Sequence, residues 1–169
     1  MKKLLFTALI ALILAGCGKD VAPTATNTGI TYNALVNGIS LPMSQIQNTV
    51  DGTAMSGNVK NQDGGLLTLY AAIDHGFVTK ARLVIMPSAK GNLPSDASNL
   101  KTMIQILGNA APTWGNRQDW FISAFSSAHT TPNTKVIGMH MGNEFSIIEV
   151  PELRSFELEI SPAKIDSAK

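Results

Sequence analysis

Three histidines are the side chains in this chain best suited to proton transfer or metal binding. His75 follows an aspartate in a predicted turn, His129 ends a predicted helix, and His140 lies in a predicted strand. No two of them have the short spacing that is typical of a zinc-binding pair. The sequence therefore predicts no metal centre and no cofactor.

The tripeptide Met139-His140-Met141 suggests copper, because thioether and imidazole groups are good copper ligands. In an extended strand, however, successive side chains point to opposite faces of the sheet. The two methionines would then share one face and His140 would occupy the other. We therefore interpret them as core methionines next to a hydrogen-bonded histidine.

Nucleophilic catalysis has no local motif to support it. The serines of the region, Ser123, Ser126 and Ser127, lie within a predicted amphipathic helix and not at a strand-to-helix elbow. No glycine-rich phosphate-binding loop occurs. We expect that the protein is not an enzyme, although carboxylates from distant positions can assemble a site that no local pattern reveals.

Cys17 is the only cysteine among the 169 residues. It follows two lysines at positions 2 and 3, and then an apolar run over residues 4–15, the arrangement of a secretory signal peptide. As a helix, this run would measure about 18 Å, whereas a membrane-spanning helix must cross about 30 Å of hydrocarbon. A lone cysteine in an exported chain has no disulfide partner within the chain, so it is free, intermolecular or modified.

Leu14-Ala15-Gly16-Cys17 resembles the lipobox of bacterial lipoproteins. The resemblance covers only the first 18 residues. It implies cleavage before Cys17 and attachment of a diacylglyceryl group, with fatty acyl chains such as palmitate, to the sulfur. Two or three such chains anchor a protein far more firmly than one. Enteric lipoproteins that stay in the inner membrane carry Asp after the cysteine, and the Gly18 found here therefore favours the outer membrane, on its periplasmic side.

The lipobox and the small, polar, aperiodic residues that follow it predict three parts: a signal peptide (1–16), a lipidated cysteine with a flexible tether (17–29) and one globular domain (30–169). Removal of the signal peptide changes the formal net charge from +1 to about −1. A nearly neutral chain has no basic surface of the kind that binds nucleic acid. We therefore expect a membrane-anchored protein that does not bind nucleic acid.

The first half of the domain is predicted to be mostly strand. We expect a strand over Ile30–Val36, a helix over Pro42–Val50, and a loop or weak strand over Thr53–Gly65. A hairpin should follow, because alternating apolar residues lie on both sides of Asp74-His75-Gly76. A three-residue turn pairs Leu69 with Ala81 and keeps both apolar faces together, with Gly76 in a left-handed conformation.

The second half predicts helix, helix, strand, strand, strand. The helices run from Ser95 or Asp96 to Gly108 and onward from Asn116, and the strands are Lys135–Met141, Glu144–Val150 and a last one around Phe156–Ile160. Glu157 and Glu159 mark a solvated face of the last strand. We therefore predict an α+β domain in which an antiparallel sheet carries two amphipathic helices on one face.

A candidate contact surface comprises Trp114, Arg117 and Trp120, together with His75 in its turn. Exposed tryptophans with an arginine are typical of protein contacts, and burial of the rings is the alternative. The order of elements also resembles that of small outer-membrane assembly lipoproteins and related inhibitors.

We therefore expect a lipid-anchored envelope protein with a non-catalytic binding or scaffolding domain and an envelope protein as partner. An inhibitor or immunity-type lipoprotein that acts on a partner protein is one alternative. A periplasmic enzyme with a dispersed site is the other.

Overall fold

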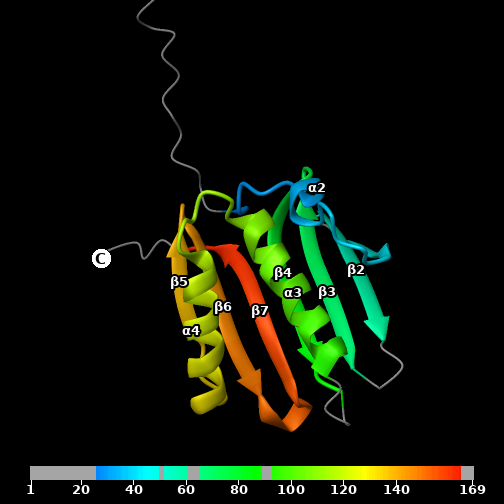
Figure 1. Cartoon of the computed structure of the whole chain (residues 1–169). Coiled ribbons are helices and arrows are strands. Elements are labelled where there is room, and N and C mark those ends of the chain that lie inside the picture. Colours follow the sequence, from blue (N-terminus) through cyan, green and yellow to red (C-terminus); the bar gives the residue numbers. More distant parts are fainter. Residues whose placement is uncertain (1–25, 50–51, 61–64, 89–92, 165–169) are drawn as a thin grey trace, which may run out of the picture.

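The computed structural model describes residues 26–49, 52–60, 65–88 and 93–164 (Figure 1). Seven antiparallel strands form one sheet in the order β1-β2-β3-β4-β7-β6-β5. The elements are α2 (Tyr32–Leu35), β1 (Met43–Thr49), β2 (Gly52–Lys60), β3 (Leu66–Asp74), β4 (Phe77–Met86), α3 (Leu93–Ala110), α4 (Arg117–Thr130), β5 (Val136–His140), β6 (Asn143–Val150), the 3-10 turn η1 (Pro151–Leu153) and β7 (Ser155–Pro162). The predicted α+β class with an antiparallel sheet is confirmed, but the described residues contain three helices and not two.

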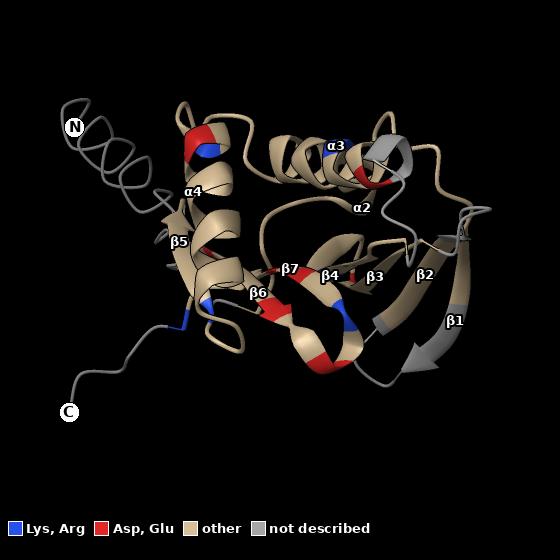
Figure 2. Ribbon diagram, turned by 60° about the horizontal axis from the view of Figure 1, so that its bottom comes forward, with Lys and Arg blue, Asp and Glu red and all other residues tan. Residues whose placement is uncertain are grey.

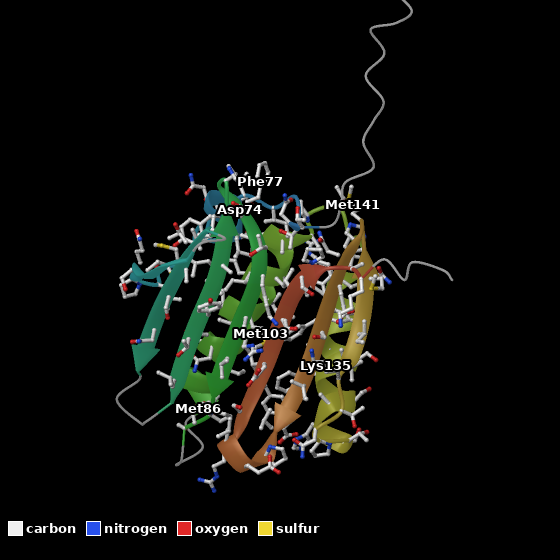
Figure 3. All side chains as sticks on the ribbon, turned by 180° about the vertical axis from the view of Figure 1, so that it is seen from behind. Asp74, Phe77, Met86, Met103, Lys135 and Met141 are labelled. Atoms are coloured by element: carbon white, nitrogen blue, oxygen red, sulfur yellow. The ribbon has the colours of Figure 1, made fainter. Side chains whose placement is uncertain are left out.

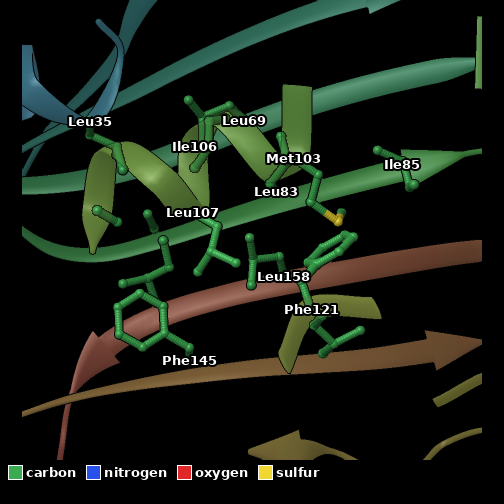
Figure 4. Close-up of a cluster of buried hydrophobic side chains, with 14 of the residues drawn as sticks. Leu35, Leu69, Leu83, Ile85, Met103, Ile106, Leu107, Phe121, Phe145 and Leu158 are labelled. Carbon is green, nitrogen blue, oxygen red and sulfur yellow. The ribbon is translucent and has the colours of Figure 1, made fainter. Parts of the chain in front are cut away.

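The core lies between the sheet and the long helices. Figure 1 shows α3 and α4 in front of the sheet, and Figure 3, seen from behind, shows the sheet in front of the helices. Leu83 on β4 and Leu158 on β7 are paired across the sheet and are almost completely buried. In the cluster drawn in Figure 4 they meet helix residues such as Met103 and Phe121. Burial of each such side chain stabilises the fold by about 1.5–3 kcal/mol.

The strand predicted over Ile30–Val36 is wrong beyond its first residues. Ile30 does pair with β4, because its carbonyl accepts a hydrogen bond from the N–H of Val78 at 2.8 Å. The chain then turns into the short helix α2, where the Thr31 hydroxyl accepts a hydrogen bond from the N–H of Ala34 at 3.2 Å. This N-terminal cap competes with strand pairing. It lets Leu35 reach the core, where it is fully buried.

The helix predicted over Pro42–Val50 is also wrong, because this segment contains β1, and much of the expected loop over Thr53–Gly65 is β2. A few apolar residues at helical spacing are a weak signal, and antiparallel pairing with β2 satisfies the backbone instead. The two strands approach closely where the sulfur of Met43 lies over Gly57, leaving no room for a Cβ atom. The conformation of this segment is therefore set by its pairing with β2 and not by its local sequence.

The β3–β4 hairpin has a two-residue turn, His75–Gly76, with Asp74 opposite Phe77. The predicted three-residue turn and its pairing of Leu69 with Ala81 are wrong. An irregularity between Ala72 and Ile73 shifts the register, so that Leu69 lies opposite Leu83. The bulge brings the two apolar faces together, which is the constraint that the prediction rested on. Gly76 has the expected positive φ, +83°.

Two boundaries in the second half also differ from the prediction. Helix α3 begins at Leu93 and continues through Gly108 to Ala110. Asp96 does not mark its start; its carboxylate accepts a hydrogen bond from the N–H of Ser88 at 3.0 Å. The β5–β6 turn is Met141–Gly142, one residue earlier than the expected Gly142-Asn143, and both of its residues have positive φ.

Candidate contact surface at the tether end

The described chain enters the domain at one end of the sheet. Thr28 donates its N–H to the carbonyl of Val78 at 2.9 Å, and its own carbonyl accepts a hydrogen bond from the Asn143 side chain at 2.9 Å. Figure 3 shows Phe77 and Met141 at this end and Met86 at the opposite end. We call it the tether end, defined by Thr28, the turns His75–Gly76 and Met141–Gly142, and the loop over residues 111–116.

A groove with a volume of about 500 Å³ lies at the tether end. Its lining is mostly small and apolar: Thr28, Gly29, Ile30, Thr31, Ala34, Asn109, Ala110, Ala111, Pro112, Thr113, His140, Met141 and Asn143. The amides in this lining hold the groove together. Asn143 binds the Thr28 carbonyl, and the Asn109 side chain donates to the carbonyls of Leu35 at 3.0 Å and Asn37 at 2.8 Å. The groove is thus a fixed part of the fold.

Thr113 joins His140 and Met141 within this groove. Its hydroxyl lies 2.9 Å from Nε2 of His140 and donates to the sulfur of Met141 at 3.2 Å. The interpretation of Met139 and Met141 as core residues is wrong, because 56% and 78% of their surfaces are exposed. Met141 lies in a turn and not in an extended strand, which is why it can share a partner with His140. Sequence reasoning missed Thr113, which lies 27 residues from His140.

The two tryptophans pack together against β5. Their ring centroids are 5.0 Å apart, and the Trp114 ring stacks on His140 at 5.4 Å with an interplanar angle of 6°. Both rings are half-buried, and they lie so close to Gly138 that a Cβ atom there would be 2.6 Å from Trp120. Arg117 donates from Nη1 to the carbonyl of Trp114 at 3.0 Å. The tryptophans therefore have a packing role, and their contact with a partner stays a prediction.

His75 does not join this cluster. It lies on the β3–β4 turn, its side chain is 90% exposed, and it pairs with Asp74 at 2.6 Å. His129, on α4, pairs instead with Glu149 of β6 at 2.9 Å. The structure thus places the three histidines in three separate environments. Within the described ranges, no group of three or more His, Cys, Asp or Glu side chains could hold a metal ion.

Charged side chains also gather on the sheet, around Glu159 of β7 (Figure 2 colours the charges). Its carboxylate contacts Lys80 at 2.9 Å, Arg82 at 3.1 Å and Lys135 at 3.3 Å. Burial alone would raise the pKa of Glu159, but hydrogen bonds from the three cations outweigh it and lower the pKa to about 2. This cluster links β4, β7 and the start of β5, which indicates a structural role.

Replacement of Glu159 by glutamine should lower the free energy of unfolding by about 1–2 kcal/mol at pH 7, because three cations lose their shared anion. The depressed pKa contributes stability above the unfolded-state value of 4.5, and this contribution is lost as the pH falls towards 2. Denaturant titrations at several pH values test this. Parent and variant should converge between pH 4.5 and 2, and a constant difference over that range would contradict the role of the ionised carboxylate.

The comparisons with known proteins concern the start of the chain. Residues 1–17 match the family model of the prokaryotic membrane lipoprotein lipid attachment site. The chain carries a lipoprotein lipid attachment site. The resemblance to a bacterial lipobox is thus confirmed, and it indicates a lipid-anchored protein of the cell envelope. Cys17 itself lies outside the described residues. No curated protein and no solved structure matches the chain.

Proposed function

We propose that this lipid-anchored envelope protein acts by non-catalytic binding, holding an envelope protein partner at the periplasmic side of the outer membrane. The attachment site at residues 1–17 supports the anchor. Gly18, which follows the modified cysteine, supports the outer membrane over the inner membrane. The domain would then provide a binding surface held at the membrane and would catalyse no reaction.

One observation carries the non-catalytic part of the proposal. The groove that contains His140 has no aspartate or glutamate in its described lining. The two histidines that do have carboxylate partners, His75 and His129, lie outside this groove. Acid–base catalysis by histidine commonly uses a carboxylate to orient the imidazole and stabilise its cation. Histidine and carboxylate are thus kept apart in the described lining of this groove.

A periplasmic enzyme is the second candidate, and a specific contact favours it. The hydroxyl of Thr113 lies 2.9 Å from Nε2 of His140, a distance at which a base can activate a nucleophile. One contact argues against an enzyme: the Thr113 hydroxyl that faces Nε2 of His140 also donates a hydrogen bond to the sulfur of Met141. An inhibitor or immunity-type lipoprotein is a special case of protein binding, and identification of the partner would reveal it.

Single alanine replacements of His75, His129 and His140, and Thr113→Val, should leave the protein's function largely intact. The test is complementation of a deletion strain, with circular dichroism and membrane fractionation as checks on folding and location. Loss of function in a folded, correctly located His140→Ala or Thr113→Val variant would support the enzyme instead. His129→Ala is the matched control, because His129 lies outside the groove.

Capture of the partner tests the positive half of the proposal. The acylated protein, cross-linked in intact cells and purified from detergent-solubilised envelope, should retain the same envelope protein in the parent and in His140→Ala. The Cys17→Ser variant should lose it, because without the lipid the domain is no longer anchored in the outer membrane. Equal capture of the partner by the parent protein and by Cys17→Ser would contradict the proposal that the anchor brings the domain to its partner.

A further inference from the structure

The point where the tether joins the domain is held by several hydrogen bonds. Thr28 binds the carbonyl of Val78 through both its N–H, at 2.9 Å, and its hydroxyl, at 2.7 Å, and its own carbonyl binds Asn143. It follows Cys17 by eleven residues, which can span at most about 40 Å when fully extended. The lipid anchor therefore keeps the tether end within that distance of the bilayer at all times.

Exposed apolar side chains lie on both sides of this entry point. Phe77, with 38% of its surface exposed, precedes the Val78 that binds Thr28. Met141, with 78% exposed, lies two residues before the Asn143 that binds it from the other side. Figure 3 shows both at the same end of the sheet. The tether thus enters between two exposed apolar side chains.

The charged groups near these side chains are of both signs: Asp74 and Glu144 lie beside the two turns, and Lys164 lies near the second turn. In the β3–β4 turn, the carboxylate of Asp74 is paired with His75. The exposed Lys164 follows Ala163, whose N–H binds the carbonyl of Gly142 in the β5–β6 turn at 2.8 Å. The described lining of the groove beside the Met141–Gly142 turn includes no aspartate, glutamate, lysine or arginine. A lysine near the surface is attracted to anionic lipids, and uncharged small residues cost little to bring into the headgroup region.

We propose that the tether end rests on the lipid bilayer that holds the acyl chains of Cys17, with Phe77 and Met141 in the headgroup region. Because the anchor raises the effective concentration of the bilayer, two apolar side chains are enough for contact. This inference rests on the lipid anchor and not on the proposed partner binding. It assigns the exposed His75 turn to lipid, and leaves the face of the sheet opposite α3 and α4 to a protein.

Site-specific quenching tests the orientation. Since the native cysteine is acylated, Phe77→Cys, Met141→Cys and Leu153→Cys each introduce one free thiol for a fluorescent probe. Leu153, 56% exposed in η1, is the control, because η1 joins the ends of β6 and β7 remote from the Met141–Gly142 turn. In vesicles of phosphatidylethanolamine and phosphatidylglycerol with brominated acyl chains, probes at 77 and 141 should be quenched about twofold or more over the probe at 153. Equal quenching at all three positions would overturn the proposal.

A variant with a longer tether distinguishes binding of the tether end to lipid from simple closeness of that end to the bilayer. Gly-Ser residues inserted between Gly18 and Thr26 should leave the quenching ratio unchanged if the tether end binds lipid, and should reduce it towards one if only the short tether holds that end near the bilayer. The second result would also overturn the proposal. Partner capture is measured separately, so that either proposal can fail without the other.

Removal of one apolar contact gives the final check. Met141 has a φ of +47°, a conformation that asparagine adopts more readily than methionine, so that Met141→Asn should keep the fold. Quenching of a probe at Phe77→Cys should then fall by about half or more. Leu153→Asn is the matched control and should not change it. An unchanged signal in Met141→Asn would show that Met141 does not contact lipid.

Discussion

Cells that produce the Cys17→Ser variant should incorporate no labelled fatty acid into this protein. A serine hydroxyl is a much weaker nucleophile than a thiolate, so the diacylglyceryl group is not transferred. The lipobox resemblance implies cleavage just before the modified cysteine, so the variant should also keep its signal peptide and migrate as a larger species. Metabolic labelling and gel mobility measure both effects, and the loss of label should be essentially complete.

Gly18→Asp is the matched control for this experiment. It leaves the lipobox intact and should therefore keep its fatty acid label. The sorting rule implied by the resemblance predicts that the variant moves from the outer to the inner membrane, which density-gradient fractionation would detect. A parent protein without label would refute the lipid anchor, whereas a labelled Gly18→Asp protein with unchanged location would refute only the assignment to the outer membrane.

Gly138→Ala should lower the free energy of unfolding by about 2–3 kcal/mol, a large effect for one added methyl group. The new Cβ atom would lie 2.6 Å from the ring of Trp120 and 2.7 Å from that of Trp114. Trp114 cannot move away easily, because it also packs against Phe145, at a centroid distance of 5.3 Å, and stacks on His140. Denaturant unfolding followed by tryptophan fluorescence measures the change directly.

Gly115→Ala is the control next to the same tryptophan. Apart from the two neighbouring residues in the chain, no atom lies within 4 Å of the Cβ that this substitution adds, so stability should change by less than about 0.5 kcal/mol. Equal stability of Gly138→Ala and the parent would mean that the two rings can rearrange freely. In that case, the tryptophans would be available to a partner and would not serve mainly as packing for β5.

Local patterns predicted the parts of this protein that depend on local physics. The lipobox could be read directly, because enzymes recognise it as a short peptide. The buried positions of α4, Phe121, Ala124 and Ala128, follow from helical spacing. The alternation in β7, with Phe156, Leu158 and Ile160 buried, follows from the two-residue period of a strand.

Other elements depend on partners that are distant in the sequence. The sequence of β1 lacks the two-residue period of a strand, and the segment is a strand because β2 pairs with it. The sequence predicted the β3–β4 hairpin but not its exact register, because a two-residue turn and a three-residue turn differ little in local sequence. The observed register, with Ala71 opposite Ala81, comes from a bulge that lets the apolar faces of the two strands match.

The candidate contact surface likewise has one part that the sequence predicted and another that only the tertiary structure shows. Sequence alone identified Trp114, Arg117 and Trp120 as a group because they lie within seven residues. Only the tertiary structure brought Thr113 to His140 and separated these two residues from His75. It also placed Thr28 between the start of β4, with Phe77, and the β5–β6 turn, with Met141. The physical reason is that neighbours along a chain share a local conformation, whereas a groove is made by strands and loops whose order in the sheet differs from their order in the sequence.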